Sequence, residues 1–174
     1  LPYGMDDFEK VRTSNCYYID KTMFIRELLN ETFDINLITR PRRFGKTLTM
    51  SMLAAFFDIR KDSKEIFEGL EITADKAFCD KWMNQWPVLF LTLKDVEGDN
   101  FESAYDMLKY AVSSLCIEHA YLGNSEKADS ADRSSFAKLK NRNGADADIL
   151  SALHILTRMM KAHYGKSVIL LIDE

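Results

Sequence analysis

Short apolar runs alternate with helical patterns along most of this chain. Residues 33–39, 88–93 and 167–172 are runs of mainly aliphatic and β-branched residues with the length of buried strands. Residues 100–115 and 148–164 instead repeat their apolar positions at the spacing of amphipathic helices. Strands that alternate with helices predict an α/β fold, with a mostly parallel sheet and flanking helices.

The remaining segments complete this organisation. Three of them have helical patterns without an internal Gly or Pro: 23–29, 48–57 and 74–86. We interpret residues 1–32 as a lead-in segment with a helix, and residues 33–174 as the α/β domain. Residues 123–147 form a polar break, which we predict to be mostly a loop or lid, with room for a short helix around 135–139.

A predicted strand, a basic loop and a predicted helix follow one another around Gly45. This order, with Gly-Lys-Thr before the helix, is that of a phosphate-binding loop. The helix N-terminus offers free N–H groups, and Gly45 lets the backbone approach a phosphate. Lys46 can reach the β- and γ-phosphates as a catalytic residue, and the Thr47 hydroxyl can ligate Mg²⁺. The predicted nucleotide-binding residues are Arg42, Arg43, Phe44, Gly45, Lys46, Thr47 and Leu48.

The first position of the loop departs from the general phosphate-loop pattern. That pattern requires glycine where this chain has Arg40, and Pro41 then removes one backbone donor. The alternative interpretation is a basic surface loop or a nucleic-acid patch. Four of the seven residues 40–46 are cationic, namely three arginines and Lys46. The flanking strand and helix favour phosphate binding.

The apolar run 167–172 ends in Asp173 and Glu174. An apolar strand that ends in an acid is typical of a Walker B element, whose Asp holds Mg²⁺ in phosphate-loop NTPases. An ordinary core strand followed by two solvated acids has the same pattern. Together with Gly-Lys-Thr upstream, the pair predicts a P-loop NTPase-like sheet with Asp173 and Thr47 at the metal. Both motifs lie at carboxyl ends of predicted strands, where ligands bind in parallel sheets.

Composition excludes several classes of protein. Among 174 residues, 47% are hydrophobic and 29% charged, with a net charge of −4, so neither a broadly basic nucleic-acid surface nor a membrane span is indicated. The three cysteines are far apart and, with the three histidines, form no metal-ligand spacing. We expect small buried thiols in a reducing compartment and a cytoplasmic protein.

Several motifs resemble one bacterial family. They are Tyr17 to Thr22, Leu37 to Thr47, Phe67 to Leu70, Pro87 to Lys94 and Leu171 to Glu174. Over nearly the whole chain these motifs are similar to the predicted AAA-ATPase-like proteins of gut and anaerobic bacteria. In this family the arginine-rich loop is itself a signature, so the resemblance implies that Arg40 is a family feature.

The resemblance carries further implications. Asp173 would be the Mg²⁺ partner, and Glu174 the catalytic residue that orients or deprotonates the attacking water. Members often carry a C-terminal PD-(D/E)XK-type nuclease domain, which would add a nucleic-acid partner. Because the chain stops directly after Glu174, we expect the sequence to be truncated after the Walker B strand.

These observations favour Mg²⁺-dependent binding of ATP and its hydrolysis. One alternative is a nucleotide-gated switch with little or no turnover, which needs the same loop but no active Glu174. Another is a small-molecule kinase, for which the cations within 123–147 would form a basic lid. The expected partners are a nucleotide, nucleic acid through the missing domain and a second copy of the chain, with no membrane partner.

Overall fold

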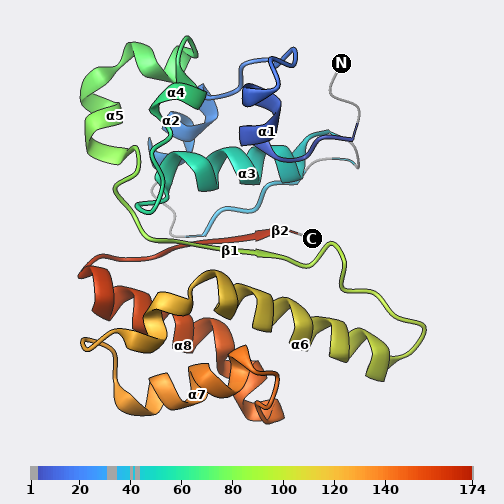
Figure 1. Ribbon diagram of the computed structural model, residues 1–174. Coiled ribbons are helices and arrows are strands. Elements are labelled where there is room, and N and C mark those ends of the chain that lie inside the picture. Colours follow the sequence, from blue (N-terminus) through green and yellow to red (C-terminus); the bar gives the residue numbers. More distant parts are fainter. Residues whose placement is uncertain (1–3, 31–34, 40, 42–43, 174) are drawn as a thin grey trace. The chain divides into compact units, whose positions relative to one another are not determined.

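The computed structural model describes residues 4–30, 35–39, 41 and 44–173 (Figure 1). The chain forms two compact units, an N-terminal unit of residues 1–86 and a C-terminal unit of residues 87–174. This boundary is a matter of packing and differs from the predicted division at residue 32. The predicted domains themselves stay a prediction.

Helices build the described part of the N-terminal unit around an aromatic core. Phe8, Phe56 and Phe67 come from three helices, and the Phe67 ring centroid lies 4.8 Å from Phe8 and 5.3 Å from Phe56. All three side chains are fully buried. The helices of this unit are α1 (Phe8–Thr13), α2 (Met23–Asn30), α3 (Lys46–Phe57), α4 (Lys64–Phe67), the 3-10 helix η1 (Glu71–Ala74) and α5 (Lys76–Trp82).

The C-terminal unit packs helices against a pair of parallel strands (Figure 1). Leu89 and Leu91 from the first strand share a buried core with Leu115, Phe136 and Leu156 from the helices. The elements are β1 (Val88–Thr92), α6 (Phe101–Glu118), the 3-10 helix η2 (Ala120–Asn124), α7 (Ser130–Lys140), α8 (Asp146–Tyr164) and β2 (Ile169–Asp173).

The two strands confirm the predicted runs 88–93 and 167–172 within a residue or two. Val88 lies opposite Ile169, and the register continues to Thr92 opposite Asp173. The long connection between the strands runs through α6, α7 and α8, as parallel pairing requires. Over the described residues the fold is therefore mixed α/β with a small parallel sheet of two strands, and a P-loop NTPase-like fold stays a prediction.

The strand predicted over 33–39 is not formed in its described part. Residues 35–39 belong to neither strand, and the side chains of Ile35 and Leu37 are 88% and 87% exposed. An apolar run predicts which residues can form a strand, but the strand exists only when a partner supplies its hydrogen bonds. Residues 33 and 34 lie outside the described part.

The helix predicted over 74–86 is shorter than expected. Ala74 is the last residue of η1, and α5 covers only Lys76–Trp82. Asn84 takes a positive φ of 55°, and its main-chain N–H donates to the Phe56 carbonyl at 2.7 Å. Its side-chain amide also donates to the Asp58 carbonyl at 2.9 Å. Because of these contacts with the end of α3, α5 ends earlier than the sequence pattern predicted.

The prediction of a mostly irregular loop over 123–147 is corrected by α7. This helix has 11 residues, and Phe136 and Leu139 are only 2% and 1% exposed. The sequence predicted only a short helix because the exposed face of α7 is strongly polar. The two buried side chains nevertheless fasten the helix into the core of the C-terminal unit.

Candidate functional site

Gly45 directly precedes α3, the helix that the sequence predicted to carry phosphate-binding residues. Its backbone is left-handed, with φ 75° and ψ 29°, which favours glycine because other residues are strained there. No side chain caps α3 at this residue. The first-turn N–H groups of an α-helix lack intrahelical acceptors and carry partial positive charge, so this end of α3 suits an anion.

The polar residues predicted to act on phosphate start this helix. Lys46 and Thr47 are its first two residues, Leu48 follows, and all three are half-buried. Thr49 closes the first turn, since its N–H and its hydroxyl each donate to the Gly45 carbonyl at 2.9 Å. Gly45, Lys46, Thr47 and Leu48 therefore lie together at the N-terminus of α3.

The loop before Gly45 is described in part. The Phe44 N–H donates to the Pro41 carbonyl at 3.3 Å, and the Phe44 side chain is 63% exposed. The predicted phosphate contacts Arg42 and Arg43, and the family-signature residue Arg40, lie outside the described residues.

The rest of α3 is anchored in the N-terminal unit. Residues 52–57 are buried, and the Phe8 N–H of α1 donates to the Ser51 hydroxyl at 3.0 Å. Tyr18 lies over the same region, with its hydroxyl 3.2 Å from the Met52 sulfur. A rigid helix holds its N-terminal N–H groups in place, as a preorganised anion site requires.

Asp173, the predicted Mg²⁺ ligand, ends β2 in the C-terminal unit. Its side chain is buried, with the residue 4% exposed, and its Oδ2 has no hydrogen-bond partner among the described residues. The main-chain carbonyl of Asp173 accepts a hydrogen bond from Leu93 N–H at 2.7 Å. The backbone of Asp173 is thus held at the carboxyl end of the sheet.

A buried carboxylate oxygen without a partner fits a cation. Burying such an oxygen is costly unless a proton, a hydrogen-bond donor or a metal compensates its charge. Mg²⁺ is usually held by one or two carboxylates together with substrate phosphates and water. Asp173 supplies one such carboxylate at the end of β2. Glu174, the predicted catalytic residue, lies outside the described residues.

Thr92 is a further polar residue at the carboxyl end of the sheet, and the sequence pattern did not single it out. It lies opposite Asp173 in the strand register, and it is exposed. Its hydroxyl oxygen accepts a hydrogen bond from Lys94 N–H at 3.4 Å. The sequence did show a polar residue near the end of the run 88–93. Only the strand register shows that this residue lies opposite Asp173.

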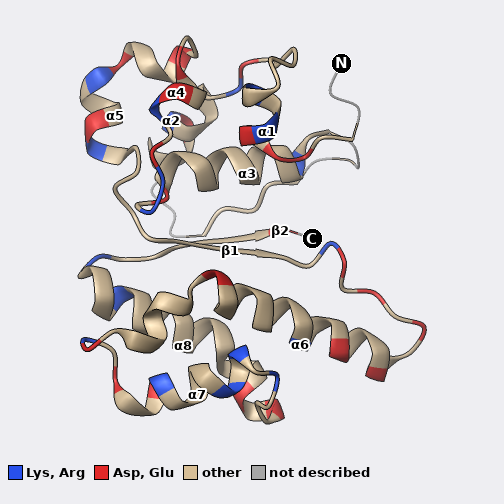
Figure 2. Cartoon of the chain, viewed as in Figure 1, with Lys and Arg blue, Asp and Glu red and all other residues tan. Residues whose placement is uncertain are grey.

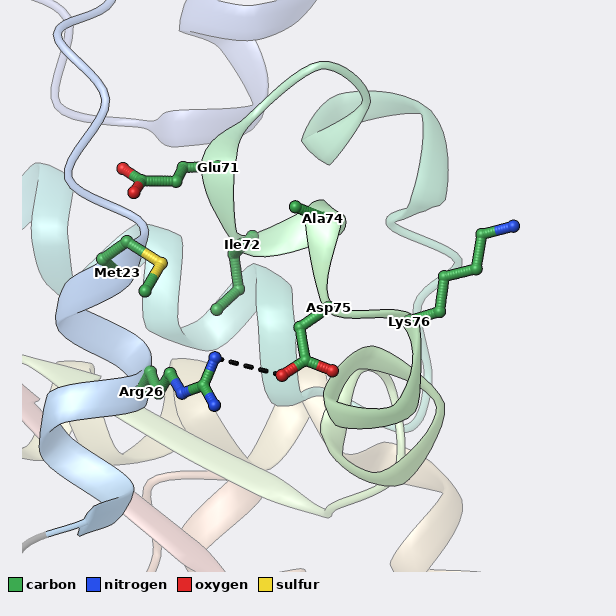
Figure 3. A pocket seen from close by; sticks show the side chains of 7 residues that line it. All are labelled: Met23, Arg26, Glu71, Ile72, Ala74, Asp75 and Lys76. Atoms are coloured by element: carbon green, nitrogen blue, oxygen red, sulfur yellow. Dashed lines mark ion pairs between the residues drawn. The ribbon is translucent and has the colours of Figure 1, made fainter.

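A hollow of about 440 Å³ in the N-terminal unit lies away from these residues (Figure 3). Arg26 from α2 points toward Asp75, and their side chains form an ion pair at 3.0 Å. Glu71 and Lys76 add one further charge of each sign to the lining. The hollow contains none of the residues that the sequence predicted for nucleotide binding.

Comparison with known proteins identifies the family. The family model described as Predicted AAA-ATPase matches residues 2–174. The chain belongs to this predicted AAA-ATPase family. The resemblance inferred from the motifs is therefore confirmed, and the family name suggests use of a nucleotide.

One curated relative comes from Azotobacter chroococcum mcd 1, where it is described as an uncharacterized protein in the vnfD 5′ region. It is 32% identical over 124 residues, which cover 71% of this chain and 22% of the relative. The chain thus spans about a fifth of that protein's length. No solved structure matches the chain significantly.

Within the described ranges, no helix combines the length and apolarity needed to cross a membrane.

Proposed function

We propose that this member of the predicted AAA-ATPase family binds ATP with Mg²⁺ and hydrolyses it, and that residues 33–174 form the ATPase-like domain. The observation that carries the proposal is Gly45 in a left-handed conformation at the uncapped start of α3, directly before Lys46 and Thr47. The unpartnered Oδ2 of the buried Asp173 supports it.

Each residue has a defined role in this proposal. The N–H groups at the start of α3 bind phosphate oxygens, and the Lys46 ammonium neutralises charge on the β- and γ-phosphates. The Thr47 hydroxyl and the Asp173 carboxylate would hold Mg²⁺, which when bound offsets charge that develops on the phosphates. Glu174 would orient the attacking water and accept its proton, and Arg42 and Arg43 would add contacts to the phosphates.

Lys46→Ala in the full-length protein tests nucleotide binding. Losing a charged hydrogen-bond donor costs about 1.5–3 kcal/mol, so ATP affinity should fall roughly 10- to 100-fold, as measured by calorimetry. Lys64→Ala is the matched control, because Lys64 is likewise the first residue of a helix, α4. Equal affinities for the Lys46→Ala variant and wild type would remove the phosphate-loop assignment.

Glu174→Gln separates hydrolysis from a nucleotide-gated switch. If Glu174 acts on water, turnover should fall about 100-fold or more while ATP affinity persists. Slow turnover that does not change would instead favour the switch. A kinase with a mobile basic lid over 123–147 is disfavoured by the burial of Phe136 in the core.

Asp173→Asn tests the metal. The variant keeps the shape of the side chain but removes its charge. It should therefore lower the affinity for ATP in the presence of Mg²⁺ more than the affinity for ATP in EDTA. A cytoplasmic location, a homo-oligomer and a nucleic-acid partner through a further C-terminal domain stay predictions.

A further inference from the structure

A groove of about 230 Å³ lies between β1 and α6 in the C-terminal unit. Phe90 from the strand and Met107 and Ala111 from the helix contribute apolar surface to it. Asp95 and Glu118 line it as well, and both are exposed. The groove therefore has an apolar interior with acidic groups at its borders, and it contains none of the proposed nucleotide contacts.

One edge of β1 borders this groove. Hydrogen bonds from Ile169 N–H to the Pro87 carbonyl and from Leu93 N–H to the Asp173 carbonyl show that odd-numbered residues of β1 bond to β2. Because the backbone alternates, Val88, Phe90 and Thr92 direct their N–H and C=O groups to the opposite edge. In the described part of the chain the sheet order is β1–β2, so no strand pairs with this edge from Val88 to Thr92. Just before β1, Trp86 forms a parallel bridge with Asp58 on the same side.

The sequence of β1 does not protect its edge. Sheet edges are usually blocked by Pro, Lys or a bulge, because a free edge pairs with other chains. Residues 88–92, Val-Leu-Phe-Leu-Thr, contain none of these. An extended segment can therefore add to β1 through main-chain hydrogen bonds.

Charge indicates what kind of segment fits. The connection from β1 to α6 carries Asp95, Glu97 and Asp99 against the single cation Lys94 (Figure 2). Glu118 adds a further acid at the groove. This border repels nucleic acid. It also disfavours pairing with β1 of a second copy, because that copy would bring the same acids.

We propose that the groove binds an extended, basic segment of a partner protein by strand addition. The segment pairs with the Phe90 and Thr92 main chain, inserts an apolar side chain between β1 and α6, and places Lys or Arg near Asp95 and Glu118. Main-chain hydrogen bonds supply affinity in this mode, and the side-chain pocket supplies specificity.

A labelled peptide of about seven residues, with lysine alternating with valine around a central leucine, is a direct probe, because alternate side chains of a strand share a face. Fluorescence anisotropy measures its binding to the full-length protein. The matched control peptides replace lysine by glutamate, or the central leucine by proline, which cannot donate a ladder hydrogen bond. We expect both controls to bind at least about tenfold more weakly.

Amide hydrogen exchange locates the binding. A peptide on the free edge should slow exchange at Phe90 and Thr92, whereas Leu89 and Leu91 already bond to β2 and should change little. Protection elsewhere with no change at Phe90 would overturn the proposal.

Variants of the groove provide the second test. Ala111→Trp fills the groove, and Asp95→Lys reverses one border charge. Each substitution should weaken binding of the lysine peptide about fivefold or more. Glu126→Lys is the control, because Glu126 is exposed and does not line the groove. Circular dichroism checks that each variant folds. Peptide binding that is unchanged in both groove variants contradicts the proposal. A concentration-dependent dimer of the wild type that Ala111→Trp abolishes also contradicts it, because the groove would then bind a second copy.

Discussion

Thr22 shows how a single hydroxyl joins two distant segments of the N-terminal unit. The residue is fully buried, and its Oγ1 donates to Asp20 Oδ1 at 2.7 Å. The same oxygen accepts from Ile72 N–H at 3.2 Å, while Asp20 Oδ2 accepts from Glu71 N–H at 2.7 Å. The loop before α2 is thereby held to η1.

Asp20 keeps its charge in this clamp. Burial raises its pKa, but hydrogen bonds from Glu71 and Thr22 outweigh that effect, so the pKa lies below its usual value. A carboxylate whose pKa is lowered by folding stabilises the protein above its unfolded pKa. That contribution is lost as the pH falls through the folded pKa. At neutral pH these hydrogen bonds are therefore fully formed.

Thr22→Val should destabilise the protein by about 1–3 kcal/mol, because it leaves the buried Ile72 N–H without an acceptor. Urea unfolding at pH 7 measures this cost. Thr22→Ser keeps the hydroxyl and should cost less than Thr22→Val. If the serine variant is the less stable of the two, packing of the methyl group and not the hydrogen bonds dominates at this position.

The cysteines should differ in reactivity. Burial raises the pKa of Cys116 to about 12, so at pH 8 roughly one thiol in ten thousand is a thiolate. Burial also raises the pKa of Cys79, with a smaller contribution from Asp75 and Asp80. We expect a thiol reagent to modify the half-buried Cys16 first, Cys79 more slowly and Cys116 last. Mass spectrometry of the native protein gives the order, and early labelling of Cys116 would contradict it.

At the scale of elements, α7 is held by contacts that its own sequence signals weakly. Besides Phe136 and Leu139, an ion pair joins Asp132 of α7 to Arg158 of α8, and the Ser113 hydroxyl of α6 donates to the Lys140 carbonyl at 2.7 Å. The helix is thus fixed to both of its neighbours. Its polar sequence reflects the solvated face.

Phe136→Ala should destabilise the C-terminal unit by about 3–5 kcal/mol, because it leaves a cavity in a packed core. Lys138→Ala on the exposed face of α7 should change stability little. Thermal unfolding monitored by circular dichroism compares the two. Equal and small effects would mean that residues 123–147 form a loosely attached lid after all.

The difference between a local pattern and a tertiary contact also explains residues 35–39, which precede the predicted phosphate loop. Its apolar residues predict a strand correctly as a propensity, yet Ile35 and Leu37 remain exposed and residues 35–39 pair with no strand in the described part. A strand is a relation between two segments, and one sequence window contains only one of them.

At the scale of the whole molecule, the residues proposed to act on Mg²⁺–ATP are spread over the chain. Lys46 and Thr47 belong to the N-terminal unit, and Asp173 belongs to the C-terminal unit. The proposed function therefore predicts a coupling between these residues through the nucleotide and its metal.

A double-mutant cycle of Lys46→Ala and Asp173→Asn in the full-length protein measures this coupling. Residues that act on the same Mg²⁺–ATP should be non-additive by about 0.5–3 kcal/mol in binding free energy. Calorimetry with ATP and Mg²⁺ provides the four affinities, and repetition in EDTA should reduce the coupling. Additive effects would mean that the two residues do not share a ligand.

The sequence by itself determined the family, the two segments that form strands, the main helices and the Gly-Lys-Thr start of α3. These features depend on local periodicity, on glycine's tolerance of a left-handed backbone and on motifs within a few residues. Only the tertiary structure decided that Thr92 lies opposite Asp173, that α7 is a packed helix and that, within the described residues, β1 pairs with a strand on one edge only, beside a groove. Each of these depends on contacts between residues far apart in the chain, which no local pattern encodes.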